Sequence, residues 1–289
     1  QFLGRIPDFD ECNIEKHFNS IKKDGVVRVH DMLLVSEEAL RKIKSRPEGR
    51  NASFWAAPEL YESLPPDLQR EVAGLKLFTD GSLGARTGAM LQNYRGESNK
   101  GLLCYTDARL LESLRRAAEL GKAVAMHALG DRALDQILGA LRSLRAQGQH
   151  LPATRIEHAM FINARQAEEF KRMGVTLSMQ PNFSWDSVEY GESLPEGYPE
   201  INNPFRMLID DIGFEPGADL LFGSDGMPTG VDAGLSAALF PPYEGQTLTL
   251  DEFVRGYAVA EEPNRFMVEI DHERRQVNLL EPADLREAI

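Results

Sequence analysis

The sequence has little cysteine and no long apolar run. Its 289 residues include only two cysteines, Cys12 and Cys104, which lie far apart in the chain. A disulfide framework is therefore excluded, and a reducing compartment, the cytoplasm, is the expected location. No apolar run approaches the roughly 20 residues of a membrane-spanning helix, and no signal peptide is visible. The chain opens at Gln1 rather than Met, as expected of a fragment or a processed product.

Positive charge is the second shortage. The chain has 32 Lys and Arg residues against 45 Asp and Glu residues, so its formal net charge is −13. Because phosphate groups repel such a chain, we expect no nucleic acid and no membrane among its partners, and a small-molecule substrate instead. The hydrophobic fraction of 42% is ordinary for a globular protein. A chain of this length buries a sizeable core without metal or disulfide support.

What the sequence does contain is a repeated order of short apolar strand, loop and amphipathic helix. Strands are predicted at residues 26–32, 52–57, 74–79, 123–127, 154–158, 175–180 and 219–225. Helices are predicted at about residues 10–23, 106–121, 131–146, 163–174, 232–240 and 250–260. Thr106, Asp107 and Asn163 are candidate N-caps. Strands that alternate with helices predict βαβ units and a parallel sheet.

This pattern predicts the α/β class and a (β/α)₈ TIM-barrel-like fold. We count about seven strands where a closed barrel has eight, so the barrel is expected to be one strand short. Residues 1–270 are assigned to the barrel domain, incomplete at its N-terminus, and residues 271–289 to a C-terminal remnant. A missing strand leaves two sheet edges, and exposed edges recruit partners. We therefore expect either a homodimer across the gap or an N-terminal segment that fills it.

Four side chains with useful chemistry stand in or at the carboxyl ends of predicted strands. They are Lys76, His127, His158 and Asp225. In a parallel barrel these strand ends converge on the face that binds ligands. Two imidazoles and a carboxylate suit a divalent metal such as zinc with an open coordination position. Such a metal lowers the pKa of bound water towards about 7, and a nearby carboxylate can take up the proton.

Other residues have two interpretations each. His30 ends the strand at 26–32 and is a candidate for substrate binding, as is Arg86, which could bind a carboxylate or form a loop salt bridge. Asp131 is expected to cap the helix that follows it. Glu157 is expected to point into the helix layer, because neighbouring strand residues face opposite ways. Three aromatic residues form either a substrate wall or loop packing, namely Phe183, Trp185 and Tyr190.

Six segments, in this order, resemble amidohydrolase family 3, the branch that includes N-substituted formamide deformylases. They are GVVRVHDM at 25–32, LKLFTDGSLGARTGAM at 75–90, MHALGDRAL at 126–134, RIEHAM at 155–160, MQP at 179–181 and FGSDGMP at 222–228. Each segment alone is a weak signal. The ordered set is specific, because it puts lysine, histidine, histidine and aspartate on successive strands.

The resemblance implies a metal-bearing (β/α)₈ barrel and a hydrolase that cleaves a C–N bond of an amide or formamide with a metal-activated hydroxide. In that family the residue matching Lys76 becomes an N-carboxylated lysine that bridges two metals. Those matching His127 and His158 ligate the more exposed metal. The one matching Asp225 ligates the buried metal and shuttles a proton.

The chain also departs from the family pattern. It has no His-x-His pair for the first strand, and it lacks most of the small β-sandwich domain, of which ADLREAI at 283–289 keeps only a part. At most one metal site is therefore supported. One alternative is a truncated or degenerate relative without catalytic activity. Another is a metal-free barrel enzyme with Lys76 as a Schiff-base lysine and GSDGMPTG, after the last strand, as a phosphate cradle.

Overall fold

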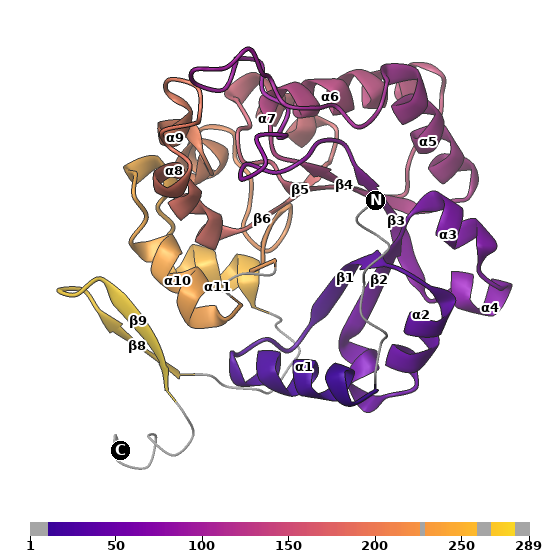
Figure 1. Ribbon diagram of the computed structural model, residues 1–289, viewed down its shortest axis with the longest axis horizontal. Coiled ribbons are helices and arrows are strands. Elements are labelled where there is room, and N and C mark those ends of the chain that lie inside the picture. Colours follow the sequence, from indigo (N-terminus) through magenta and orange to yellow (C-terminus); the bar gives the residue numbers. More distant parts are fainter. Residues whose placement is uncertain (1–10, 226–228, 259–266, 281–289) are drawn as a thin grey trace.

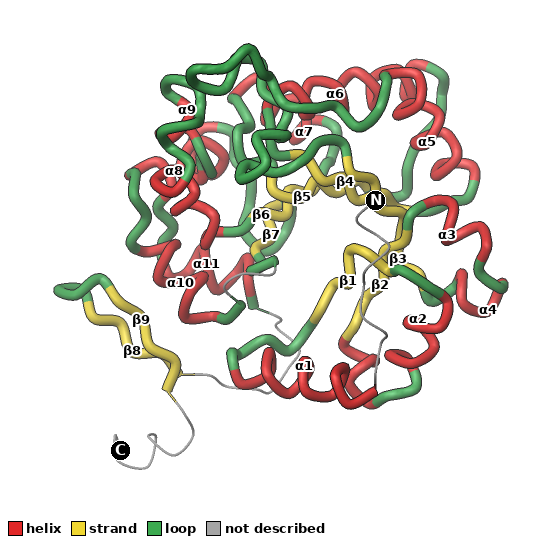
Figure 2. Tube along the Cα trace, viewed as in Figure 1, coloured by secondary structure: helices red, strands yellow, loops and turns green. Residues whose placement is uncertain are grey.

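The structure is a computed structural model that describes residues 11–225, 229–258 and 267–280. Seven strands form one curved sheet whose outer face carries the helices (Figures 1 and 2). The strands are Val29–Leu34 (β1), Ala52–Ala56 (β2), Val72–Phe78 (β3), Ala123–Ala128 (β4), Thr154–His158 (β5), Thr176–Met179 (β6) and Leu220–Phe222 (β7). Their order in the sheet follows the sequence, and all neighbours are parallel. The predicted fold class is confirmed.

The α-helices fill the segments between the strands. They are Glu11–Lys23 (α1), Glu37–Lys44 (α2), Pro58–Ser63 (α3), Pro66–Gln69 (α4), Asp107–Glu119 (α5), Asp131–Ala146 (α6), Ala164–Arg172 (α7), Asp186–Glu189 (α8), Tyr198–Ile201 (α9), Val231–Leu239 (α10) and Leu250–Tyr257 (α11). The predicted helices are found, within a few residues at each end. The additional helices α2, α3, α4, α8 and α9 were not predicted, and none of them exceeds eight residues.

Side-chain caps start two of the predicted helices. The Thr106 hydroxyl accepts a hydrogen bond from the Arg109 amide at 3.3 Å, which begins α5. Asn163 accepts from the Gln166 amide at 3.0 Å, and the Gln166 side chain accepts from the Asn163 amide at 3.1 Å. This reciprocal capping box satisfies two amides at the start of α7 that have no partner inside the helix. Thr106 and Asn163 are confirmed as N-caps, whereas Asp107 is the first residue of α5.

Asp131 does not cap α6, contrary to the sequence-based expectation. The N-cap position is held by Gly130, and Asp131 is the first residue of the helix. Its carboxylate instead accepts hydrogen bonds from the Leu91 amide at 2.8 Å and the Tyr198 hydroxyl at 2.6 Å. Asp131 therefore ties two distant loops to the start of α6.

The core lies between the outer face of the sheet and the helices. Alternate residues of β3 to β6 point outward and are buried, namely Leu75, Leu77, Val124, Met126, Ile156, Leu177 and Met179. They belong to the same core as the apolar stripe of α6, which is Leu134, Ile137, Leu138, Leu141 and Leu144. Burying one such side chain contributes about 1.5–3 kcal/mol. Because this face is fully used for packing, the opposite residues of each strand are left to line the inside of the barrel.

The ring of strands is not closed. In the part of the chain that the structure describes, no strand pairs with the free edges of β1 and β7, and we call this gap the open side. The segment after β7 is joined to the end of α1 through Asp24. Its carboxylate accepts from the Thr229 hydroxyl at 3.1 Å, and its carbonyl accepts from the Val231 amide at 3.0 Å.

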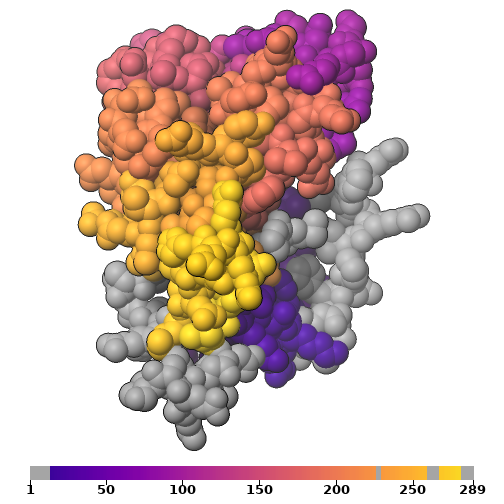
Figure 3. Space-filling view, turned by 90° about the vertical axis from the view of Figure 1, so that its left-hand side faces the viewer, coloured from indigo at the N-terminus to yellow at the C-terminus, as the bar shows by residue number. Residues whose placement is uncertain are grey.

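A two-stranded antiparallel hairpin follows, formed by Met267–Asp271 (β8) and Gln276–Leu280 (β9). It lies beside α10, with Arg275 donating to the Pro241 carbonyl at 3.2 Å (Figure 3). The hairpin was not predicted, and position 270 of the predicted domain boundary lies within β8. The segment 283–289 lies outside the described residues. None of the helices seen in the described ranges has the length and apolar character required to cross a bilayer.

Candidate active site

A cavity of about 2610 Å³ occupies the inside of the curved sheet. The four predicted residues Lys76, His127, His158 and Asp225 all line it, as does His30. Small-molecule sites commonly measure roughly 300–1,000 Å³. The cavity is larger because it extends to the open side, where residues of β1 and β7 form its walls.

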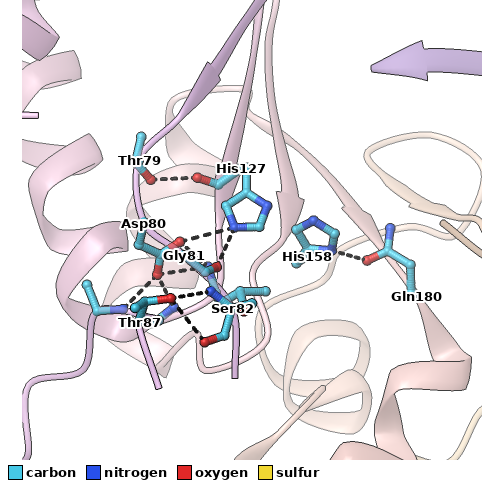
Figure 4. Close-up of polar contacts among 12 residues, drawn as sticks. Thr79, Asp80, Gly81, Ser82, Thr87, His127, His158 and Gln180 are labelled. Carbon is cyan, nitrogen blue, oxygen red and sulfur yellow. Dashed lines mark hydrogen bonds and ion pairs between the residues drawn. The ribbon is translucent and has the colours of Figure 1, made fainter. Parts of the chain in front are cut away.

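His127 lies at the carboxyl end of β4 and has one ring nitrogen engaged. Its Nε2 lies 2.8 Å from the Gly81 carbonyl oxygen, an atom that can only accept a hydrogen bond (Figure 4). Burial, followed by the nearby His158, lowers the pKa of His127 to about 3, so the ring is neutral at pH 7. Its single proton is therefore on Nε2. Nδ1 has no hydrogen bond within the described residues.

His158 ends β5 and shows the opposite arrangement. Its Nδ1 lies 2.7 Å from Oε1 of Gln180, whose amide group is oriented by donating to the Ser178 carbonyl at 3.3 Å. The proton of His158 is therefore on Nδ1. Burial, and then the charge of Lys76, lowers the pKa of His158 to about 3. The residue has a φ of 72°, a left-handed conformation that is rare outside glycine.

The two rings lie next to each other. Their centroids are 4.7 Å apart and the ring planes meet at 74°. Each ring is neutral, with one nitrogen that donates and one that keeps its lone pair, which is the state in which imidazole binds a metal. Among the described residues, no three His, Cys, Asp or Glu side chains gather closely enough to hold an ion. The pair thus fits two ligands of a metal site, and further ligands must be of another kind.

Lys76 lies inside the barrel on β3 and is only 4% exposed. Its Nζ lies 4.8 Å from the centre of the Phe78 ring and makes no hydrogen bond among the described residues. Burial lowers the pKa of Lys76 to about 8, although the carboxylate of Glu157 opposes the shift. At pH 7 about a tenth of the amine is therefore neutral, far more than for an ordinary lysine. The residue is chemically suited to react as an amine.

Asp225 follows β7 and reaches the cavity from the open side. Its φ is 55°, so it too has a left-handed backbone. Partial burial raises the pKa of the carboxyl, and the nearby His127 ring and the Lys76 amine oppose that rise. The structure therefore brings Asp225 to the same cavity as the other three residues, but on a different wall.

The two candidate substrate-binding residues have different environments. His30 lines the cavity, where its Nδ1 accepts from the Trp55 indole at 3.3 Å, and burial followed by the charge of Arg155 lowers its pKa to about 4. Arg86 does not line the cavity and instead forms an exposed ion pair with Glu97. The structure thus favours the loop salt bridge over the carboxylate-binding role for Arg86.

Glu157 does not point into the helix layer, which corrects the expectation from strand alternation. It lines the cavity and pairs with Arg155, whose Nη2 donates to Oε2 at 2.9 Å and to the Ser178 hydroxyl at 2.8 Å. Ile156 is the residue that faces outward. His158 would follow it by alternation, but the left-handed backbone turns its ring back into the cavity.

The aromatic residues of the following loop belong to the cavity wall. Phe183, Trp185 and Tyr190 all line it. Phe183 stacks on His158 with ring centroids 5.9 Å apart, whereas Trp185 is 50% exposed. All three residues therefore line the cavity, and Phe183 packs against the histidine pair.

We assigned Asp80 no role from the sequence, yet it lies beside the histidine pair. Its side chain is fully buried, and Oδ1 lies 3.4 Å from Nε2 of His127 (Figure 4). It accepts hydrogen bonds from the backbone amides of Ala89, Leu129 and Gly130 at 2.9–3.0 Å. Burial raises the pKa of Asp80 to about 6, although these amides oppose the shift. No local motif marks such a residue, because most of its partners are distant in sequence.

Comparison with known proteins gives a consistent result. A family model described as the amidohydrolase family matches residues 14–231, which is more than half of the chain. The protein YtcJ of Bacillus subtilis, named as an amidohydrolase, is 34% identical over 115 residues, or 39% of this chain and 21% of that protein. The N-substituted formamide deformylase of Arthrobacter pascens is 29% identical over 86 residues, or 29% and 16%.

A solved structure resembles most of the chain. It is an uncharacterized metal-dependent hydrolase from Pyrococcus furiosus, with a TM-score of 0.71 and 27% identity. The match covers 86% of this chain and 53% of that chain. The chain therefore spans about half the length of this hydrolase, and a smaller share of the two sequence relatives.

Proposed function

The chain belongs to the amidohydrolase family, and from that membership we propose that it is a metal-dependent hydrolase that cleaves the C–N bond of an amide or formamide. The metal dependence follows the similar Pyrococcus furiosus hydrolase, which is named for it. The formamide substrate class follows the relative named as an N-substituted formamide deformylase. Zinc is the first candidate for the metal, because two neutral imidazoles suit it well.

One observation carries the proposal. His127 and His158 lie with ring centroids 4.7 Å apart, and each presents a nitrogen that no described residue engages. A hydrogen bond on the other nitrogen fixes which one is available, and this is the usual arrangement of histidine ligands.

Each residue of the candidate site would have its own role in the proposed hydrolysis. Nδ1 of His127 and Nε2 of His158 would hold the metal, which supplies Lewis acidity and activates water when bound. The neutral amine of Lys76 would add to carbon dioxide, losing one proton and forming an anionic carbamate that also serves as a ligand. Asp225 would accept a proton from water and return it to the leaving amine. Phe183 and Trp185 would exclude water from the far side of the substrate.

The experiment is to measure metal content per chain by mass spectrometry on protein purified without chelators. The matched variants are His127→Ala with Lys76→Ala, and His150→Ala as the control, since His150 is exposed at the other end of the barrel. We expect near-stoichiometric zinc, manganese or iron in the wild-type protein and in the control. The double variant should lose it.

Absence of metal in the wild-type chain, even after reconstitution with bicarbonate, would contradict the proposal. The chain would then be treated as a degenerate relative without activity. If metal is bound, hydrolysis of N-substituted formamides and simple amides should be lost together with the metal in the double variant.

The depressed pKa of Lys76 favours one second candidate, a Schiff-base enzyme. Borohydride reduction in the presence of a carbonyl substrate distinguishes the two, because it would trap the substrate on Lys76 only in the Schiff-base case. The proposed phosphate cradle GSDGMPTG includes residues 226–228, which lie outside the described residues. A small-molecule substrate, a cytoplasmic location and a homodimer across the open side stay predictions.

A further inference from the structure

The loops after β3 and β4 meet directly beside His127. Residues 79–81 come from the first loop, as Figure 4 shows, and Leu129 and Gly130 come from the second. A Cβ at Gly130 would lie 1.9 Å from the Ala89 carbonyl oxygen, so only glycine permits the two backbones to come this close. The tightest point of the crossing is occupied by the carboxylate of Asp80.

Three backbone amides hold that carboxylate in place. Oδ2 accepts from Ala89 and Gly130, both at 2.9 Å, while Oδ1 accepts from Leu129 at 3.0 Å. With no exposed surface and three fixed donors, the group has little freedom to rotate. The Leu129 amide also lies 3.3 Å from Oδ2, and Nε2 of His127 lies 3.4 Å from Oδ1.

We propose that Asp80 is a positioning residue that keeps the proton of His127 on Nε2, so that Nδ1 retains its lone pair. Asp80 acts in two ways. Its carboxylate attracts the N–H of Nε2 directly, and its anchoring fixes the adjacent Gly81, whose carbonyl accepts from the same nitrogen at 2.8 Å. A carboxylate or carbonyl behind a histidine ligand sets its tautomer and increases its basicity.

The expected effect of Asp80 on metal binding rests on the proposed function. The effect of Asp80 on the tautomer of His127 does not depend on that function. Asp80 would touch neither metal nor substrate, and it would act entirely through His127. Loss of such a partner commonly weakens metal binding by about 10- to 100-fold.

The decisive variant is Asp80→Asn. Its amide oxygen can replace Oδ2 and keep the bonds from Ala89 and Gly130, while its NH₂ group replaces Oδ1 and gives up the 3.0 Å bond from the Leu129 amide. A donor then faces Nε2 of His127 where an acceptor stood, and this favours the tautomer with the proton on Nδ1. We expect the ratio of the two tautomers to shift by about tenfold, because an attractive contact with the N–H of Nε2 is replaced by a repulsive one.

The matched control is Asp131→Asn. Asp131 is also a buried carboxylate that anchors the same region, through the Leu91 amide and the Tyr198 hydroxyl, but no contact with His127 is found among the described residues. If the substitutions merely loosened the loops, the two variants should change the tautomer ratio of His127 equally. A positioning role predicts that the tautomer ratio of His127 changes in Asp80→Asn and stays the same in Asp131→Asn.

The measurement is the imidazole ¹⁵N spectrum of the metal-free chain, with the His127 signals assigned by their loss in His127→Ala. Zinc affinity is then measured by competition with a chelator. We expect an Nε2–H pattern in the wild-type protein and in Asp131→Asn, a shift towards Nδ1–H in Asp80→Asn, and zinc binding about 10- to 100-fold weaker in that variant.

An Nδ1–H pattern in the wild-type protein would overturn the inference, and this test holds even if Asp80→Asn fails to fold. So would a folded Asp80→Asn with the wild-type tautomer ratio, or an equal shift in Asp131→Asn. If the wild-type chain binds no zinc, the proposed function fails, and the ¹⁵N comparison still decides the role of Asp80.

Discussion

The two sides of the sheet are built differently. From β3 to β6, which we call the closed side, each strand is paired with the next in continuous register and covered by α5, α6 and α7 (Figure 1). On the open side, β1 and β7 do not pair within the described residues, and Asp24 provides the hydrogen bonds across the gap. Most of the core stabilisation therefore belongs to the closed side.

The candidate site follows the same division. Lys76, His127 and His158 come from three neighbouring strands of the closed side, so sheet register fixes their spacing. Asp225 comes from the open side, where no such register exists. Residues that must keep a fixed geometry are best held on rigid elements. We therefore expect the geometry of the histidine pair to tolerate substitutions on the open side. Three substitutions compare how much the two sides contribute to stability.

Phe170→Ala should have the largest effect. Phe170 lies on α7, is fully buried and belongs to the core of the closed side. Removing its ring leaves a cavity, so we expect the free energy of unfolding to fall by about 3–5 kcal/mol. Urea denaturation measures this, with Leu102→Ala as the control because Leu102 is 61% exposed. A loss no larger than that of the control would show that the closed side does not carry the core stability.

Gly74→Ala should have an intermediate effect. A Cβ at Gly74 would lie 2.4 Å from the Trp55 ring and 2.6 Å from the Ala123 carbonyl oxygen. This overpacking inside the barrel should lower the free energy of unfolding by about 1–3 kcal/mol. The control Gly139→Ala lies in α6 with open space around the added methyl group and should instead stabilise the protein by about 0.5–1 kcal/mol. If both variants changed the free energy of unfolding in the same direction, the explanation by overpacking at Gly74 would be contradicted.

Asp24→Ala should have the smallest effect. It removes the acceptor of the Thr229 hydroxyl but keeps the backbone bond to Val231, so we expect a loss of about 0.5–1 kcal/mol. A double-mutant cycle with Thr229→Val isolates the contribution of this one bond. A loss as large as that of Phe170→Ala would mean that the open side contributes as much stability as the closed side.

The predictable part of the fold was encoded locally. The apolar stripe at 131–146 and the caps Thr106 and Asn163 depend on residues within one or two helical turns, and all three were predicted from the sequence. The β8–β9 hairpin was not, because it buries little. Met267 is 46% exposed, and Val277 is the one apolar residue of the described hairpin that is buried, so the alternating pattern of a half-buried strand is weak.

The same distinction applies to the site. Lys76, His127 and His158 could be selected because a strand end is a local property. Glu157 was assigned to the wrong face because the left-handed backbone of His158 cannot be inferred from residue type. Asp80 was not assigned a role, since Leu129 and Gly130 are 49 and 50 residues away in sequence. Contacts of that range become visible only when the sheet has brought the loops together.

The order of the strands also bears on how the chain is made. Because each strand pairs with the one that precedes it in sequence, the sheet can assemble in the order in which a ribosome releases it. Each new strand covers the edge left by its predecessor and exposes one of its own. Throughout synthesis, the free edge of β1 stays the same while the other edge advances, and a chaperone would have these two edges to shield from other nascent chains.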